Sequence, residues 1–385
     1  MLVTLKALGC RLNEAELESW SNDFQSLGYS ITNKTEIADI VVVNTCAVTQ
    51  EAVKKSRQLI RKSHRINPKA KLIVSGCYSS LNPEITNEIE TIDLVVANKN
   101  KDKLAQIVND EINLEAMPSI ATEPGESALF ARGRNRAFIK VQDGCRYRCT
   151  FCIVTIARGD ERSKAVSDIV NEINTLHQQG IQEAILTGVH IGGYGSDIES
   201  NLYTLIKTIL AETDIPRLRL GSVEPWDLGE NFFELFANPR FMPHLHLPLQ
   251  SGSDSVLRRM ARRCKTDDFS RLLIKACSSI ADFNVTTDII VGFPGESDEE
   301  WEENLTFVES CKFSHIHIFP YSPRQGTRAA SMPDQLDLIT KKTRTRQLHQ
   351  LANEMRIEIL KKYVGRDFPV LFENHIKQTN RLVNR

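Results

Sequence analysis

Strand-like and helix-like segments alternate over most of this sequence, and this alternation restricts the fold more than any other feature. The first part of the chain contains the short apolar runs LVTLKALGC, ADIVVVNTC, AKLIVSGC and DLVVAN, and the segments between them have the length or the periodicity of helices. Short strands separated by helices are typical of a parallel sheet covered by helices. We therefore expect a doubly wound parallel sheet, the α/β class, in residues 1–115.

Three cysteines of this region, Cys10, Cys46 and Cys77, each follow a predicted strand directly. In open α/β sheets, the loops beyond the carboxyl ends of the strands gather at one edge, where ligands bind. We therefore expect the three thiols to converge there. The residues alone leave a second explanation equally open, in which these are unrelated cysteines that pack in the core.

The alternation resumes after residues 111–135, which contain two prolines, lack clear periodicity and are predicted to be a linker. Six further strand candidates follow in residues 131–330: AFIKVQ, EAILTG, RLRLGS, HLHLPL, VTTDIIVG and SHIHIFP. This is the repeat of a β/α barrel, but a closed barrel needs about eight units. The sequence therefore predicts an open (β/α)6 partial barrel.

The end of the chain follows a different pattern. Residues 331–364 are predicted to form a long helix that Gly365 ends, followed by the strand-like PVLFE. We expect residues 365–385 to form a short or truncated β module at the carboxyl end.

Composition favours a protein with reduced thiols. The 385-residue chain has nine cysteines, and its first residues, MLVTLKALGC, lack the basic and apolar regions of a secretion signal. No apolar run approaches the roughly 18 residues that a membrane helix needs. We expect a cytoplasmic protein without a membrane segment, whose thiols are available to a metal. Basic runs at 54–65, 258–265 and 341–346 permit an anionic partner, although such runs are more often solvated helix faces.

The motif C-x3-C-x2-C, formed by Cys145, Cys149 and Cys152, follows the first barrel strand. Structural zinc prefers four ligands, and no fourth cysteine or histidine has a suitable spacing nearby. A thioredoxin-type pair would leave Cys145 without a role. Three thiolates suit a [4Fe-4S] cluster that keeps one iron free of protein ligands.

This motif, with an aromatic residue before its last cysteine, resembles the signature of the radical S-adenosylmethionine (SAM) superfamily. The resemblance implies that the free iron chelates the methionine part of SAM, and that an electron from the cluster cleaves SAM to a 5′-deoxyadenosyl radical. It also implies SAM-pocket roles for residues at the barrel strand ends. These candidates are Phe151, Thr187, Gly188, Ser222, Glu224 and Gln250.

The segments LGCRLNEAE, VVVNTCAVT and VSGCYS resemble the amino-terminal domain of the radical SAM methylthiotransferases. The resemblance implies that Cys10, Cys46 and Cys77 hold a second [4Fe-4S] cluster that supplies or carries sulfur. One SAM then donates a methyl group to that sulfur, and another yields the radical that removes hydrogen from the substrate carbon.

GCRLNEAE is most similar to the branch that acts on N6-threonylcarbamoyladenosine at tRNA position 37. The alternatives are the branches that modify N6-isopentenyladenosine in tRNA or an aspartate of a ribosomal protein. Arg11 and Asn13 are candidate contacts of the substrate or the cluster, although an asparagine after a strand is also an ordinary turn or cap residue.

The resemblance implies tRNA as the partner and a flavodoxin or ferredoxin as the electron donor. Family members normally end in an RNA-binding β-barrel, the TRAM domain, of which only a short segment is present here. Two other classes stay open from the residues: a non-catalytic protein that binds zinc and RNA, and an electron carrier that ignores SAM.

The remaining cysteines, Cys264, Cys277 and Cys311, are interpreted as packing residues. Several histidines lie in or beside barrel strands, and alternate positions place His244 with His246, and His315 with His317, on one face. A polar wall explains these pairs and His190 better than a metal site does.

Overall fold

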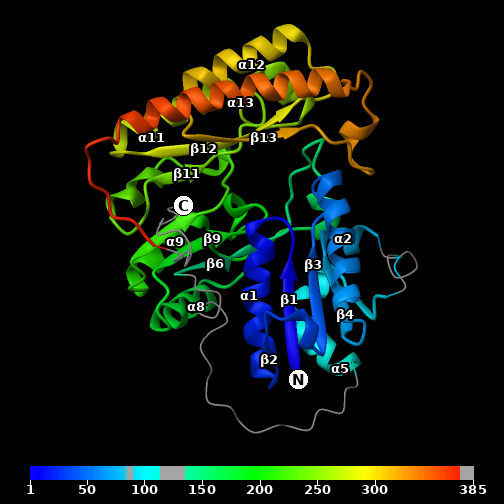
Figure 1. Ribbon diagram of the computed structural model, residues 1–385. Helices are drawn as coiled ribbons and strands as arrows, with labels where there is room; N and C mark the ends of the chain where they lie inside the picture. Colours follow the sequence, from blue (N-terminus) through cyan, green and yellow to red (C-terminus); the bar gives the residue numbers. More distant parts are fainter. Residues whose placement is uncertain (83, 85–88, 90, 113–134, 373–385) are drawn as a thin grey trace.

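The computed structural model describes residues 1–82, 84, 89, 91–112 and 135–372, which form two α/β units (Figure 1). The first unit is a parallel sheet in the order β2-β1-β3-β4-β5. Its strands are Leu2–Ala7 (β1), Ser30–Ile31 (β2), Ile40–Thr45 (β3), Lys71–Gly76 (β4) and Leu94–Val96 (β5). The doubly wound prediction is therefore confirmed.

Helices cover both faces of this sheet. Its helices are Arg11–Ser26 (α1), Gln50–Ile66 (α2), Cys77–Leu81 (α3) and Leu104–Glu111 (α5), with short 3-10 turns at Thr35–Ile37 (η1) and Asn98–Lys103 (η2). The apolar residues divide into two separate clusters. One contains Trp20 and Phe24 of α1, and the other contains Ile60 of α2. Each cluster is buried under its own helices, as expected when a sheet is covered on both sides.

The second unit contains all six predicted barrel strands. They are Arg136–Lys140 (β6), Glu183–Thr187 (β9), Arg217–Leu220 (β10), His244–His246 (β11), Asn284–Val291 (β12) and His315–Pro320 (β13). They pair in parallel as β10-β9-β6 and β11-β12-β13. Isolated bridges from Leu218 to Phe241 and from Ser222 to His246 connect the two sheets. This is the expected open partial barrel.

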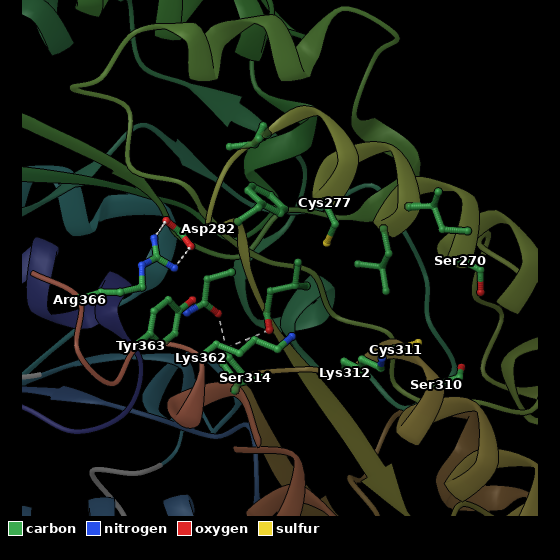
Figure 2. A pocket seen from close by; sticks show the side chains of 17 residues that line it. Ser270, Cys277, Asp282, Ser310, Cys311, Lys312, Ser314, Lys362, Tyr363 and Arg366 are labelled. Atoms are coloured by element: carbon green, nitrogen blue, oxygen red, sulfur yellow. Dashed lines mark hydrogen bonds and ion pairs between the residues drawn. The ribbon is translucent and has the colours of Figure 1, made fainter. Parts of the chain in front are cut away.

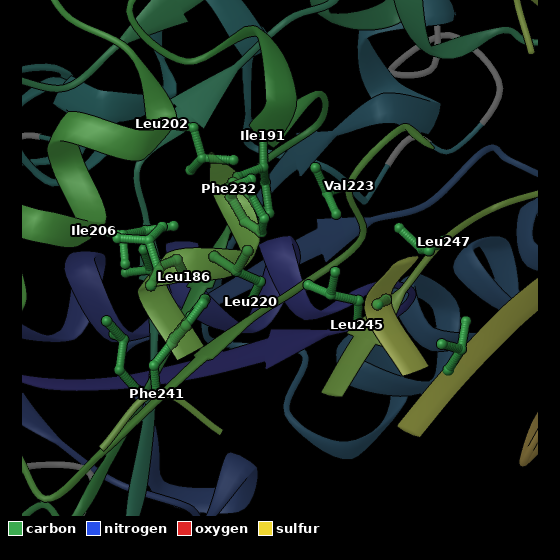
Figure 3. Close-up of a cluster of buried hydrophobic side chains, with 14 of the residues drawn as sticks. Leu186, Ile191, Leu202, Ile206, Leu220, Val223, Phe232, Phe241, Leu245 and Leu247 are labelled. Atoms are coloured by element: carbon green, nitrogen blue, oxygen red, sulfur yellow. The ribbon is translucent and has the colours of Figure 1, made fainter. Parts of the chain in front are cut away.

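Apolar residues on the outer face of the barrel strands form the main core. Leu186, Leu220 and Leu245 come from three successive strands and belong to one buried cluster, which also contains Leu202 and Ile206 of α9 (Leu202–Glu212) and Phe232 of the 3-10 turn η5 (Phe232–Ala237) (Figure 3). The surrounding elements are Val154–Arg158 (α7), Val166–Gln178 (α8), Leu202–Glu212 (α9), Asp254–Arg259 (α10), Thr266–Ser279 (α11), Asp298–Cys311 (α12), the turns Ile191–Gly193 (η3), Pro225–Asp227 (η4), Phe232–Ala237 (η5) and Arg328–Ser331 (η6), and the hairpin Gln142–Asp143 (β7) with Arg162–Ser163 (β8).

The carboxyl-terminal segment differs from its prediction. The long helix α13 covers Leu338–Lys361 and begins later than expected, because the Asp337 side chain caps it by accepting hydrogen bonds from the backbone N–H groups of Ile339 and Thr340. Gly365 has a φ of 80°, which agrees with its predicted role after the helix. The expected strand PVLFE is wrong for residues 369–372, which lie in the described part of the chain and form no strand.

Some expectations fall on residues that the structure does not describe. These are most of residues 83–90, which belong to one of the helical segments expected between the first strands, most of the linker at 111–135 and the final residues 373–385. In the part of the chain that is described, no helix combines the length and the apolar character required to cross a bilayer.

The two units meet along α1 and α3. Ala15 of α1 packs with Phe138 of β6 and Ile185 of β9, so that α1 lies against the barrel strands (Figure 1). At the second contact, α3, which begins at Cys77, packs against α7, which follows Cys152. The segments that carry the two sets of cysteines are therefore neighbours.

Candidate functional site

The amino-terminal cysteines lie at the carboxyl ends of three neighbouring strands, as predicted. Strands β1 and β3 are adjacent, and the sheet order reverses at this point, where open α/β sheets bind ligands. A Cβ atom on Gly9 would lie 2.7 Å from Cys46 Cβ. A Cβ atom on Gly76 would lie 2.3 Å from the carbonyl oxygen of Thr45. Both glycines have positive φ, so the loops that carry Cys10, Cys46 and Cys77 approach more closely than other residues allow.

Asn13 ties these loops together rather than facing a substrate. Its Nδ2 donates to the carbonyl oxygen of Leu8 at 2.7 Å and to that of Thr45 at 3.3 Å. Asn13 is fully buried, and its Oδ1 accepts from Arg158 at 3.1 Å. The donors and the acceptor of Asn13 are used inside the protein, and Cys10 Sγ lies 3.8 Å from its Oδ1, so Asn13 lies beside the amino-terminal trio. Arg11, in contrast, is exposed and lies 5.8 Å from the ring centroid of Phe138.

Cys145, Cys149 and Cys152 lie in the loop between β7 and α7. The backbone N–H of Cys145 donates to the carbonyl oxygen of Gly159, and the backbone N–H of Cys152 donates to the carbonyl oxygen of Cys149. These two hydrogen bonds fold the loop back on itself. Burial raises the pKa of Cys145 to about 12 and that of Cys152 to about 11. Repulsion between the thiolates of this trio adds to both shifts.

Cys46 behaves in the same way in the other trio. Burial raises its pKa to about 11, and the charges that Cys10 and Cys77 would carry raise it further. Thiolates gathered in such a place need a cation to balance them, and soft metals such as iron bind thiolate ligands. Both trios therefore have the donor chemistry of an iron–sulfur cluster.

Arg262 is a buried cation beside the second trio. Its side chain is 2% exposed and donates to both carboxylate oxygens of Glu224, at 3.0 and 2.6 Å. It also lies 3.8 Å from Cys149 Sγ. Sequence reasoning missed this residue, because the run RRMARRCK was interpreted as a solvated face or an RNA contact. Arg259 of the same run pairs with Glu300 at 2.6 Å, so this interpretation is wrong for both arginines.

The predicted SAM-pocket residues all lie at or just beyond the carboxyl ends of barrel strands, or in the cysteine loop. Thr187 ends β9 and Gly188 follows it. Ser222 and Glu224 follow β10, and Gln250 follows β11. Phe151 packs against an apolar cluster that includes Met260 and Phe293. Gln250 has a φ of 79°, a left-handed conformation that is rare for residues other than glycine.

A histidine close to the second trio was not expected. His190 Nδ1 lies 2.6 Å from Glu161, and its Nε2 lies 2.5 Å from Asp227. Ligand atoms of Cys145, Glu161 and His190 all lie within 4.8 Å of one another. The sequence suggested no further metal ligand near the motif, because Glu161 and His190 reach Cys145 only through folding. His190 therefore belongs to this site rather than to a simple polar wall.

The paired histidines lie on the barrel strands as expected. His246 Nε2 lies 3.1 Å from Asp288 Oδ1, and ligand atoms of His246, Asp288 and His317 lie within 4.8 Å of one another. These three residues could hold a cation.

The remaining cysteines do not join either trio. Cys264 is buried in the main core and Cys311 packs at its edge, which confirms their packing role. Cys277 is exposed and lines a cavity of about 650 Å³ at the amino-terminal ends of β12 and β13, so its predicted packing role is wrong (Figure 2). An ion pair between Asp282 and Arg366 lies at the same cavity.

Arg158 and Asn98 connect the two trios. Arg158 Nη1 donates to Glu16 at 2.9 Å and to Asp143 at 3.0 Å. Burial alone would lower the pKa of Arg158, but Glu16, Cys77 and Asp143 together raise it well above its ordinary value. Asn98 Nδ2 donates to the carbonyl oxygen of Ala157 at 2.7 Å and lies 4.0 Å from Cys77 Sγ. The two thiol sites thus share one boundary.

Two protein families match this chain. Residues 2–97 match the family described as "Uncharacterized protein family UPF0004", and residues 139–308 match the radical SAM superfamily. The first match contains Cys10, Cys46 and Cys77, and the second contains Cys145, Cys149 and Cys152.

Curated relatives match nearly the whole chain. The threonylcarbamoyladenosine tRNA methylthiotransferases MtaB of Bacillus subtilis and Thermotoga maritima are 35% and 36% identical over 98% and 97% of this chain, and 86% and 87% of their own lengths are covered. The tRNA-2-methylthio-N(6)-dimethylallyladenosine synthase of B. subtilis is 32% identical over 97% of this chain and 76% of its own length.

A solved structure supports the fold. The radical SAM methyltransferase TsrM from Kitasatospora setae, with cobalamin and a [4Fe-4S] cluster bound, superposes with a TM-score of 0.62 at 18% identity, over 86% of this chain and 77% of that chain. At this identity the likeness concerns the fold alone.

Proposed function

This chain belongs to the radical SAM tRNA methylthiotransferases, and we propose that it methylthiolates C2 of N6-threonylcarbamoyladenosine at tRNA position 37. One observation carries the proposal. Two separate thiol trios meet at the boundary between the sheet domain and the partial barrel, where Arg158 and Asn98 connect them. A reaction that joins sulfur to an unreactive carbon needs a sulfur site and a radical site close together.

We assign Cys10, Cys46 and Cys77 to the cluster of the amino-terminal domain, residues 1–115, and Cys145, Cys149 and Cys152 to the cluster of the partial barrel, residues 131–330. The donor set supports this assignment, because each trio offers three thiolates and leaves one iron of a [4Fe-4S] cluster without a protein ligand. When bound, the clusters and SAM supply the radical chemistry and the methyl and sulfur groups.

The residues around the barrel trio orient these groups. Arg262 holds the Glu224 carboxylate in a bidentate pair and places a positive charge beside Cys149, which favours its thiolate. We propose that Thr187, Gly188, Ser222, Glu224 and Gln250 line the SAM pocket, and that Phe151 contacts adenine. Their common location at the carboxyl-terminal face of the barrel supports this role.

We propose that α2 contacts the tRNA backbone. This helix follows the Cys46 loop, and Lys54, Lys55, Arg61 and Lys62 are exposed on it. A flavodoxin or ferredoxin is the proposed electron donor. A tRNA substrate also favours a cytoplasmic location.

The test uses the enzyme reconstituted anaerobically with iron and sulfide, together with SAM, a reductant and tRNA carrying N6-threonylcarbamoyladenosine. Mass spectrometry of the nucleosides should detect its 2-methylthio derivative. A product from isopentenyladenosine alone would assign the chain to the other tRNA branch, and a modified ribosomal-protein aspartate would remove tRNA as the substrate.

Iron content tests the two-cluster assignment separately. The wild-type chain should bind about eight iron atoms, and Cys77→Ala or Cys149→Ala should each bind about four. Cys277→Ala is the matched control and should keep the full iron content. Zinc in place of iron, with no 5′-deoxyadenosine formed from SAM, would favour the non-catalytic class.

A further inference from the structure

The inner face of the barrel strands carries polar as well as apolar side chains. Residues that alternate with the apolar outer ones point into the lumen, since successive side chains of a strand face opposite sides. Phe138, Ile185 and Arg219 lie side by side on β6, β9 and β10. Phe138 and Ile185 pack with Ala15 of α1, so this row faces the amino-terminal domain across the opening of the barrel.

Arg219 is a half-buried cation that lacks a counter-ion among the described residues of this lumen. No hydrogen bond or ion pair reaches its guanidinium from any residue that the structure describes. Glu183, whose charge acts on Arg219, is held by Arg217 at 2.9 Å and Arg136 at 3.3 Å. Burial, together with the charges of Arg136, Arg11 and Arg217, lowers the pKa of Arg219. Because the neighbouring Glu183 carboxylate is already held by two other arginines, an anionic ligand would supply the counter-ion of Arg219.

Arg11 brings a second cation to the same place from the other domain. Its guanidinium carbon lies 5.8 Å from the ring centroid of Phe138, which lies in the same row as Arg219, with Ile185 between them. The charge of Arg11 also acts on His244 and His317 of the opposite strands. Arginines from both domains therefore face one lumen.

His244 adds an unused hydrogen-bonding group. Its Nε2 lies 3.1 Å from Thr286 Oγ1, while its Nδ1 is buried and has no hydrogen-bond partner within the described ranges of the chain. Burial and the charge of Arg219 lower the pKa of His244 to about 3, so the ring is neutral at physiological pH. A neutral imidazole can bond a hydroxyl or amide group next to an anion.

We propose that the barrel lumen binds the carboxylate of the N6-threonylcarbamoyl group, with Arg219 as its principal ligand, Arg11 as a second cation and His244 as a hydrogen-bonding partner of the neighbouring polar atoms. This inference rests on the proposed function and names the residues that select its substrate. An isopentenyl group has no charge or hydrogen-bonding atom, and its binding would leave the Arg219 charge buried and unpaired.

RNA phosphate is the other source of an anion. Arg219 is an inward-facing residue within β10, one position before the strand ends, and is therefore inside the barrel. A base with its side group can extend into such a lumen, whereas the phosphates stay on the outside of the RNA. The position of Arg219 favours the carboxylate.

The experiment compares two anticodon stem–loop RNAs that differ in one group. One carries N6-threonylcarbamoyladenosine, and the other carries its neutral analogue, in which the threonine carboxylate is a carboxamide. Binding is measured by fluorescence anisotropy with the holoenzyme and without reductant, so that no turnover occurs. The wild-type protein should prefer the acid by about 10- to 100-fold.

Arg219→Ala should bind the two RNAs with about equal affinity, and Arg219→Lys should keep part of the preference for the acid. Arg346→Ala, a change of an exposed arginine on α13, should keep the wild-type preference. If Arg219→Ala does not fold, as judged by circular dichroism and iron content, Arg219→Gln compared with Arg219→Lys decides the question. An unchanged preference, or equal weakening of both RNAs as expected for a phosphate contact, would overturn the proposal.

A parallel turnover assay separates this inference from the proposed function. If neither RNA acquires a 2-methylthio group, the proposed function fails, while the binding ratio still decides the carboxylate site. If the product forms and Arg219→Ala keeps the full preference, only the inference fails.

Discussion

Arg158 Nη1 lies 2.9 Å from Glu16 Oε1, although the two residues are 142 positions apart in the chain. Arg158 ends the helix that follows Cys152, and Glu16 lies on the helix that follows Cys10. Both side chains are 2% exposed. One buried ion pair therefore connects the two cysteine loops directly, and the proposed radical and sulfur sites depend on how these loops lie relative to each other.

Arg158→Ala should destabilise the protein and misalign the two sites. The change leaves Glu16 and Asp143 buried with one cation fewer, which should lower the free energy of unfolding by about 3–5 kcal/mol. Misplacement of the reacting groups by about 1 Å should lower kcat by about 100-fold. Urea unfolding and nucleoside mass spectrometry measure the two effects. Arg346→Ala is the control, and wild-type kcat in Arg158→Ala would contradict the positioning role.

Glu16 should contribute stability that depends on pH. Burial alone would raise its pKa, but Arg158, Lys101 and Lys140 together hold the pKa well below its ordinary value of 4.5. A carboxyl group with a lowered pKa in the folded state stabilises the protein above its unfolded pKa, and this contribution is lost as the pH falls toward the folded pKa.

Glu16→Gln should therefore lower the free energy of unfolding of the cluster-free protein by about 3 kcal/mol at pH 7. The difference from the wild type should shrink below about pH 4.5, where the unfolded carboxyl group becomes protonated. Urea unfolding from pH 7 to pH 3 measures this difference. If the difference in unfolding free energy between Glu16→Gln and the wild type is constant over this range, the Glu16 charge does not stabilise the folded protein.

The Gln250 side chain should strengthen SAM binding, while its backbone conformation lowers the free energy of unfolding. Its φ of 79° costs a residue with a side chain about 1–2 kcal/mol. Gln250→Gly should raise the free energy of unfolding by about 1 kcal/mol, since glycine adopts this conformation readily. Gln250→Ala keeps the backbone strain but removes the same side-chain contacts, so it is the variant with which Gln250→Gly is compared. Both variants should bind SAM about tenfold more weakly in calorimetry, and unchanged affinity in both would exclude a contact by this side chain.

The basic face of α2 should account for part of the salt dependence of tRNA binding. Replacing Lys54, Lys55, Arg61 and Lys62 with Ala should weaken binding, and the slope of log K against log salt should become shallower by about 0.7–0.9 for each phosphate that the variant no longer binds. Anisotropy titrations at several salt concentrations measure the slope. The control replaces Lys342 and Arg346, two exposed cations on α13, with Ala and should keep the wild-type slope. An unchanged slope would place the RNA on another surface.

Local pattern was sufficient to predict the strands and the positions of six cysteines. Cys10, Cys46 and Cys77 could be assigned to one sheet edge, because each follows a short apolar run and parallel strands end at the same edge. The motif that contains Cys149 could be assigned to the barrel for the same reason. The strand expected at PVLFE does not form at residues 369–372, which are described, because a strand needs a partner that the pattern of one segment does not supply.

Polar partners could not be predicted in this way. Arg262 belongs to a run that looks solvated, yet folding buries it against Glu224, which is 38 positions away. Asn13 looks available to a substrate, but it bonds Thr45 of another strand. Whether such a side chain is buried, and which partner it bonds, depends on the orientation of elements that are distant in the sequence.

The sequence by itself determined the two α/β units and which thiols each unit brings to its edge, because strand periodicity and the residues that follow each strand are local properties. Only the tertiary structure decided how the two edges meet, through Arg158 and Glu16, and which barrel arginine finds no counter-ion among the residues that the structure describes. Burial and pairing of charges depend on contacts across the whole chain, and the position of Arg219 is therefore visible only after folding.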